Sequence, residues 1–171
     1  MQPLKRIFRG CLNRIDELKL LKAEYAKKSS TLTIVYGRRR VGKTSLILEF
    51  LKDKKNSIYF LATEENENIN KNNFKKQVAE YLGNSLLETA DLDWLNIFQH
   101  LVNQKTGSKK IMVIDEFQYI GISNPAFPSI FQKAWDTLLS KNNIMVIIYG
   151  SLVNMMTTQT LAYDSPLYVQ T

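Results

Sequence analysis

The sequence contains very little of the residue types that build disulfides and soft metal sites. Cys11 is the only cysteine and His100 the only histidine among 171 residues. A single cysteine excludes an internal disulfide, and these two residues lack the spacing of metal ligands. Such a composition is typical of a reducing compartment, and we therefore expect a cytoplasmic location.

Long hydrophobic runs are also missing. The longest apolar run, Ile144 to Tyr149, is far shorter than the roughly 18 residues that suggest a membrane-spanning helix. The basic N-terminus does not develop the apolar stretch of about 7 to 15 residues that a secretory signal needs. The sequence predicts neither a membrane anchor nor a secretory signal, and no membrane partner is expected.

Acidic residues are scarce in the first third of the chain. Of the 23 Lys and Arg residues, 15 precede Asn56, and the formal net charge is +7. A basic surface attracts phosphate groups, which leaves two kinds of partner open. One is nucleic acid, and the other is the triphosphate of a bound nucleotide.

Short apolar runs alternate along the chain with segments of helical periodicity. The predicted strands are Thr31–Tyr36, Ser57–Ala62, Lys110–Ile114 and Ile144–Tyr149. The predicted helices are Leu12–Lys28, Lys43–Leu51, Phe74–Leu82, Leu92–Val102, Ser129–Ser140 and Leu152–Leu161, with a solvated loop over TEENENINKNN. This alternation predicts an α/β fold of three layers, in which helices flank a mainly parallel sheet. We expect a single domain with an N-terminal helix region over residues 1–30 and a core over residues 31–168.

A glycine-containing loop follows the first predicted strand. The residues GRRRVGKT, from Gly37 to Thr44, match the phosphate-loop pattern GxxxxGK[ST] between a strand and a helix. The glycines let the backbone approach a phosphate closely, and the helix N-terminus adds positive potential. We expect Lys43 to reach the β- and γ-phosphates and the Thr44 hydroxyl to coordinate Mg²⁺. The candidate nucleotide-binding residues in this segment are Gly37, Arg40, Val41, Gly42, Lys43, Thr44 and Ser45.

Two features near this loop have alternative interpretations. Arg38, Arg39 and Arg40 form either a solvated basic rim or a contact to the γ-phosphate or to a partner. Ser151 follows the fourth predicted strand, where its hydroxyl suits a catalytic sensor of the attacking water or a helix cap. We favour the solvated rim for the three arginines, whereas the sequence does not choose between the two roles of Ser151.

The third predicted strand is followed by two acids, Asp115 and Glu116. The carboxyl edge of a doubly wound sheet carries the ligand crevice, so a strand ending there delivers carboxylates to the site. We expect Asp115 to bind Mg²⁺ and Glu116 to act as the general base that activates water. An acidic turn of purely structural role is the alternative for this motif alone. A base on the strand itself favours an ATPase, and the guanine-reading NKxD motif does not occur.

These motifs together resemble the archaeal-type ATPase family, a P-loop group of the AAA+ and STAND-like branch. The matching blocks are NRIDEL, VYGRRRVGKTSLILEF, IYFLATEEN, VIDEFQYI, NPAFPSIFQKAWD, NIMVIIYGS and SPLY. The resemblance implies ATP as the nucleotide, Lys43 and Glu116 as catalytic residues, Thr44 and Asp115 as metal ligands, and Arg14 near the nucleotide.

The resemblance also implies parts that the sequence does not supply. Members continue past SPLY with a fifth strand and a helical lid, whereas this chain stops at Thr171. The missing strand would pair with Thr31–Tyr36, so we expect an edge open to self-association or to a partner protein. Without the lid we expect weak nucleotide affinity or slow turnover.

We expect an ATPase core whose hydrolysis of Mg-ATP drives a conformational switch. One alternative is a regulatory module that binds nucleotide without hydrolysing it and acts with nucleic acid. A small-molecule kinase is a third class, but no acceptor motif is visible in the sequence.

Overall fold

A computed structural model describes residues 5–9, 14–36 and 43–150 of the chain. Its centre is a parallel sheet of the strands β1 (Lys5–Arg9), β2 (Thr31–Tyr36), β3 (Ser57–Leu61), β4 (Lys110–Asp115) and β5 (Ile144–Gly150). The strand order is β1-β2-β5-β4-β3. All neighbouring pairs are parallel. The four strands predicted from the sequence are confirmed, and so is the parallel α/β fold.

β1 occupies the sheet edge that we expected to be open. It pairs with β2 from Lys5 opposite Leu32 to Arg9 opposite Tyr36. The sequence did not predict this strand, because KRIFR is short and mostly basic. The family resemblance instead implied that the neighbour of β2 would be a strand after the SPLY block. Short, charged strands are common at sheet edges, where they discourage further pairing. The expectation of an open edge at β2 is therefore wrong.

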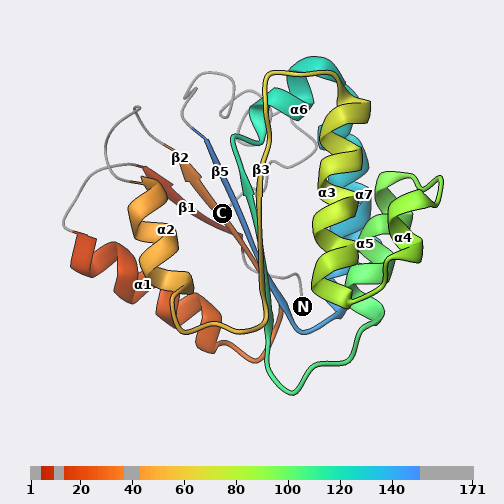
Figure 1. The fold of residues 1–171 in the computed structure, drawn as a ribbon. Coiled ribbons are helices and arrows are strands. Elements are labelled where there is room, and N and C mark those ends of the chain that lie inside the picture. Colours follow the sequence, from red (N-terminus) through yellow and green to blue (C-terminus); the bar gives the residue numbers. More distant parts are fainter. Residues whose placement is uncertain (1–4, 10–13, 37–42, 151–171) are drawn as a thin grey trace.

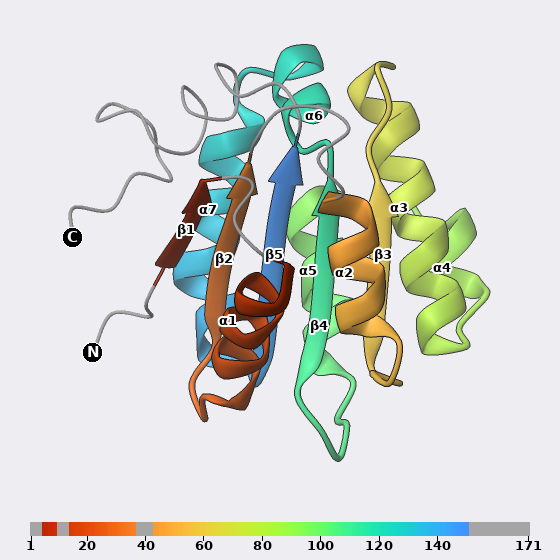
Figure 2. The ribbon, with the colours of Figure 1, turned by 90° about the vertical axis from the view of Figure 1, so that its left-hand side faces the viewer.

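Helices cover both faces of this sheet (Figure 1). One face carries α1 (Arg14–Ala26) and α2 (Lys43–Leu51), which lie in front of the strands in Figure 2. The other face carries α3 (Glu67–Leu82), α5 (Trp94–Asn103) and α7 (Phe127–Thr137). The short elements are α4 (Leu86–Thr89), α6 (Gln118–Ser123) and a 3-10 turn (Leu139–Lys141). No helix within the described ranges is long and apolar enough to cross a membrane.

Each face of the sheet has its own apolar cluster. On the side of α1 and α2, Leu46, Ile47 and Phe50 pack against strand residues such as Val113 and Ile147. The larger cluster, on the other side, is rich in aromatic rings, including Phe74, Trp94, Phe98, Phe127 and Phe131. A parallel sheet buried on both faces explains why its strands read as continuous apolar runs.

α3 begins well before the predicted helix start at Phe74, inside the run that we expected to be a solvated loop. Asn66 caps the helix, because its side-chain oxygen accepts a hydrogen bond from the Ile69 N–H at 3.0 Å. Asn70 is fully buried and bonds both the N–H and the C=O of Thr63, at 2.9 and 3.0 Å. Asparagine serves well as a helix cap. Here the polar residues start a helix, and their burial depends on contacts that the sequence does not show.

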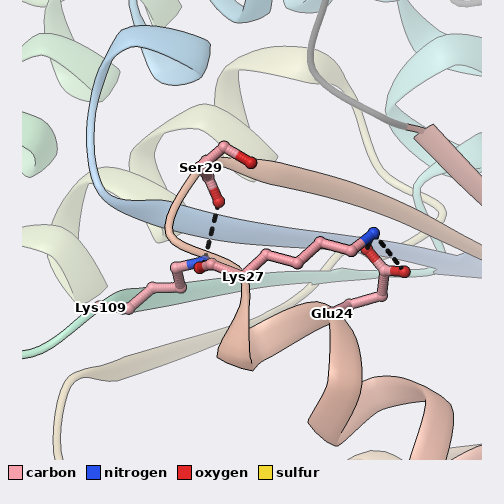
Figure 3. A network of polar contacts seen from close by, with 4 residues as sticks. All are labelled: Glu24, Lys27, Ser29 and Lys109. Carbon is pink, nitrogen blue, oxygen red and sulfur yellow. Dashed lines mark hydrogen bonds and ion pairs between the residues drawn. The ribbon is translucent and has the colours of Figure 1, made fainter.

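Two buried lysines at the amino end of β4 fix helix ends on opposite faces of the sheet. Lys109 donates hydrogen bonds to the backbone oxygens of Lys27 and, at 2.9 Å, Ser29, just after α1 (Figure 3). Lys110 donates to the backbone oxygens of Val102, at 3.3 Å, and Gln104, at the end of α5. Adjacent strand residues point to opposite faces, so consecutive lysines reach different helices. A cation at a helix C-terminus also interacts favourably with the helix dipole.

Candidate active site

The candidate site lies at the carboxyl edge of the sheet, beside the first turn of α2. β5 lies between β2, which leads into the glycine-containing loop, and β4, which ends in the acids. In the register, Tyr149 of β5 pairs with Val35 on one side and with Asp115 on the other. A side chain at the end of β5 is therefore interposed between the two predicted halves of the site.

A cluster of hydroxyl groups joins Thr44 to Asp115. The Tyr149 hydroxyl lies 3.1 Å from Thr44 Oγ1 and donates a hydrogen bond to Asp115 Oδ2. Tyr59 from β3 donates to the same carboxylate oxygen, and its hydroxyl lies 2.8 Å from that of Tyr149. The two residues predicted as metal ligands are thus brought together, with one tyrosine oxygen in contact with both.

Burial governs the ionisation of this cluster. It raises the pKa of the Asp115 carboxyl, while the hydrogen bonds from Tyr149 and Tyr59 lower that pKa. Burial also raises the pKa of both tyrosine hydroxyls, and the neighbouring Asp115 raises each of them further. The two tyrosines therefore remain protonated donors at neutral pH.

Asp115 has binding capacity that the protein does not use. Its residue is only 4% exposed, and its Oδ1 atom has no hydrogen-bond partner within the described residues. An unsatisfied buried carboxylate oxygen is costly, and in native proteins it calls for an explanation such as a bound ion or water. Carboxylate and hydroxyl oxygens are the ligands that Mg²⁺ prefers. Asp115 and Thr44 thus have the right donor atoms to hold this ion.

Glu116 follows β4 in an unusual backbone conformation. Its φ angle is +52°, in the left-handed region that side-chain-bearing residues seldom adopt. The turn is held by backbone bonds, from the Tyr119 N–H to the Glu116 oxygen at 2.9 Å and from the Phe117 N–H to the Tyr149 oxygen at 3.3 Å. The fully buried Gln118 donates a side-chain hydrogen bond to Glu116 Oε2. Such strain concentrates at functional sites, where the surrounding structure maintains it.

Several predicted site residues lie outside the described part of the chain. They are Gly37, Arg40, Val41, Gly42 and Ser151, together with the side chains of Arg14 and Lys43 and the predicted helix Leu152–Leu161. The backbone of Lys43 begins α2, and the exposed Ser45 lies in its first turn. The roles assigned to all of these residues stay predictions.

Sequence reasoning missed Tyr59, Tyr149 and Gln118. Both tyrosines were read as parts of buried strands, and Gln118 as part of the motif after Glu116. A usable signal was present, because a tyrosine near the carboxyl end of an apolar strand places a polar tip at the ligand edge of the sheet. This pattern does not show which residue the tyrosine hydroxyl contacts, because its hydrogen bond to Asp115 depends on the strand order.

Comparison with known families agrees with this geometry. The sequence pattern of the family described as an ATPase domain predominantly from Archaea matches residues 11–170. The chain belongs to this archaeal ATPase family. The resemblance inferred from the GRRRVGKT and DEFQY motifs is thereby confirmed.

Individual relatives of this ATPase domain are also archaeal. The uncharacterized protein MJECL04 of Methanocaldococcus jannaschii is 34% identical over 157 residues, which are 92% of this chain and 33% of that protein. MJ0423 of the same organism, an uncharacterized ATP-binding protein, is 50% identical over 44 residues, which are 26% of this chain and 75% of that protein. The chain therefore spans about a third of the length of MJECL04.

A solved structure shares the fold. The Walker-type ATPase of Pyrococcus abyssi superposes with a TM-score of 0.64 at 24% sequence identity, covering 94% of this chain and 52% of that one. The match confirms the P-loop NTPase type of α/β fold for this domain. At this identity it is evidence for the fold and not for a shared reaction.

Proposed function

We propose that this domain binds ATP with Mg²⁺ at the carboxyl edge of its sheet and hydrolyses it to drive a conformational switch. The observation that carries the proposal is the contact of one hydroxyl, that of Tyr149, with both Thr44 and Asp115. It brings together a helix N-terminal hydroxyl and a buried carboxylate from distant parts of the sequence. Membership of an ATPase family supports ATP as the nucleotide.

The phosphate-binding part of the site comes from the loop and the start of α2. The backbone N–H groups of residues 37–42, with Arg40 and Ser45 beside them, are proposed to surround the phosphates. Lys43 supplies a positive charge to the β- and γ-phosphates. Thr44 and Asp115 would hold Mg²⁺, which neutralises charge that develops on the phosphate oxygens.

The hydrolytic step is assigned to Glu116. Its carboxylate accepts a proton from water while the water oxygen forms a bond to the γ-phosphorus and the bond from that phosphorus to the ADP oxygen breaks. The products are ADP and phosphate, and the proton on Glu116 returns to solvent. The hydrogen bond from Gln118 and the left-handed backbone hold the Glu116 carboxylate beside the end of β4. Ser151 and Arg14 keep their proposed roles as sensor and as a residue near the nucleotide.

Single-turnover phosphate release from the full chain tests the catalytic assignment. We expect Glu116→Gln to slow release by about 100- to 10,000-fold, because it removes the base without changing the shape of the side chain. Nucleotide affinity should stay within a few-fold of wild type. Glu64→Gln, which removes an equal charge from an exposed residue after β3, should leave the rate unchanged.

Two results would contradict the proposal in different ways. Equal rates for wild type and Glu116→Gln would remove Glu116 as the base and favour a module that binds nucleotide without hydrolysing it. Failure of the wild-type chain to bind ATP in the presence of Mg²⁺ would remove the nucleotide site itself. Nucleic acid as a further partner would appear as binding that weakens steeply with salt.

A further inference from the structure

Tyr149 is the residue through which the two halves of the candidate site meet. Its side chain is 1% exposed, and its hydroxyl contacts Thr44 Oγ1 at 3.1 Å as well as Asp115 Oδ2. The position follows from the topology, because β5 separates β2 from β4 and places Tyr149 beside Asp115 in the register. Thr44 and Asp115 are thus linked through the hydroxyl group of one tyrosine.

The Tyr149 hydroxyl has a single proton and three oxygen neighbours, which are Asp115 Oδ2, Thr44 Oγ1 and the Tyr59 hydroxyl. A carboxylate that binds a cation is ionised and only accepts hydrogen bonds, so Tyr149 and Tyr59 each donate their single proton to Asp115 Oδ2. The Tyr149 hydroxyl is placed as the donor to Thr44 Oγ1 as well, so its two contacts share that one proton.

These hydrogen bonds determine which electron pairs remain for a metal. A threonine hydroxyl has one proton and two lone pairs, so a hydrogen bond from Tyr149 to one lone pair leaves the other for a metal. On Asp115, the tyrosines engage Oδ2 and leave the buried Oδ1 without a partner within the described residues. One tyrosine hydroxyl thus orients a donor atom on each of the two predicted metal ligands.

We propose that Tyr149 is a positioning residue for the magnesium site, acting as a hydrogen-bond relay between Thr44 and Asp115. It leaves a Thr44 lone pair and Asp115 Oδ1 as the atoms that face the ion or its bound water. The inference rests on the proposed function, since it assigns the metal to the same site. Residues that orient metal ligands typically change metal affinity by about 10- to 100-fold when they are removed.

Two near-identical substitutions separate this role from a general effect on the carboxylate. Tyr149→Phe removes the oxygen that contacts both Thr44 and Asp115. Tyr59→Phe removes the other donor to Asp115 Oδ2 together with the contact to the Tyr149 hydroxyl, and it leaves both contacts that form the relay. Each substitution deletes a single hydroxyl group from a tyrosine of this cluster, so the pair forms a matched comparison.

The measurement is the dependence of nucleotide affinity on the metal, without turnover. The affinity of the full chain for a non-hydrolysable ATP analogue is determined in excess EDTA and again at saturating Mg²⁺. The ratio of the two affinities reports the contribution of the metal. Binding of Mn²⁺ to the same complex, followed by electron paramagnetic resonance, gives a second measure that does not depend on nucleotide affinity.

We expect Tyr149→Phe to lower the magnesium enhancement and the Mn²⁺ affinity by about 10-fold or more. The affinity in EDTA should stay at the wild-type value, which also shows that the fold is retained. Tyr59→Phe should change the enhancement by less than about 3-fold. Urea unfolding of both variants confirms that they are compared in the folded state.

Three outcomes would overturn the relay. An unchanged enhancement in Tyr149→Phe removes the role, and an increased one shows that the hydroxyl blocks the ion. An equal loss in Tyr59→Phe assigns the effect to the carboxylate rather than to the link with Thr44. If the wild-type chain shows no magnesium enhancement, the proposed function fails, which is distinct from failure of the relay alone.

Discussion

Two lysines lie at the amino end of β4 and two carboxylates lie at its carboxyl end, and the two pairs have different kinds of partner. At the amino end, Lys109 and Lys110 donate to backbone oxygens that follow or end α1 and α5. Beside Lys109, Glu24 and Lys27 form a partly buried ion pair at 2.7 Å (Figure 3). Backbone oxygens move only when their segment of the chain moves. The ammonium groups of Lys109 and Lys110 are therefore held in place by the fold itself.

At the carboxyl end the partners are side chains, and part of the binding capacity is left over. Asp115 accepts hydrogen bonds from two tyrosines, whereas its Oδ1 atom has no partner within the described residues. Glu116 has a strained backbone and a hydrogen bond from Gln118. Side-chain partners can turn when a ligand arrives. The amino end thus contributes to stability, and the carboxyl end supplies the side chains of the proposed site at some cost in stability.

The largest expected effect is at the amino end. Lys110→Met keeps the apolar stem but leaves two helix-terminal carbonyls without their charged donor, and it should lower the free energy of unfolding by about 2 kcal/mol. Urea unfolding measures the change, with the exposed Lys105→Met as a control that should remain within about 0.5 kcal/mol of wild type. Nucleotide affinity should not change. A loss of nucleotide affinity without a loss of stability in Lys110→Met would contradict the stabilising role of the amino end.

A smaller effect on stability is expected at the carboxyl end of β4, at Glu116. Glu116→Gly and Glu116→Ala both remove the carboxylate, but only glycine adopts a positive φ angle without steric cost. The glycine variant should therefore be more stable than the alanine variant by about 1 kcal/mol. Thermal and urea unfolding give the difference, and both variants should lack phosphate release. Equal stabilities would show that the left-handed conformation stores no strain.

The smallest effect is the pH dependence of the lysine contribution. Burial lowers the pKa of the Lys110 ammonium from its ordinary value of 10.5. Between the lowered pKa and 10.5 the unfolded chain binds more protons than the folded one, so wild-type stability rises with pH relative to a variant without this lysine. The free energy of unfolding of Lys110→Met should therefore fall further below that of wild type as the pH is raised towards 10.5. Paired urea titrations at increasing pH test the sign, which a constant or narrowing difference would contradict.

Much of the fold was predictable because its strands are buried on both sides. β2 to β5 were found from runs of apolar residues, since a parallel strand covered by helices needs no polar face. β1 was missed because KRIFR has neither that pattern nor a strong alternation, and it forms a strand through its pairing with β2. The start of α3 was missed for a similar reason, because the buried contacts of Asn70 involve Thr63, seven residues away.

The site was predictable to the extent that its chemistry resides in contiguous motifs. Thr44 and Asp115 were identified from a loop and a strand end, and the structure brings them to one hydroxyl. Tyr59 and Tyr149 lie in segments with no motif of their own. Their role depends on the sheet, which places both tyrosines beside Asp115. Along the chain, Asp115 is 56 residues from Tyr59 and 34 residues from Tyr149.

The sequence by itself determined the chemical groups of this protein and the family to which it belongs. Local patterns suffice for that, because a phosphate loop and an acidic strand end each need only a few adjacent residues. Only the tertiary structure decided that β1 closes the edge at β2 and that β5 places a tyrosine between Thr44 and Asp115. Strand order arises from packing across the whole sheet, and no local pattern contains it.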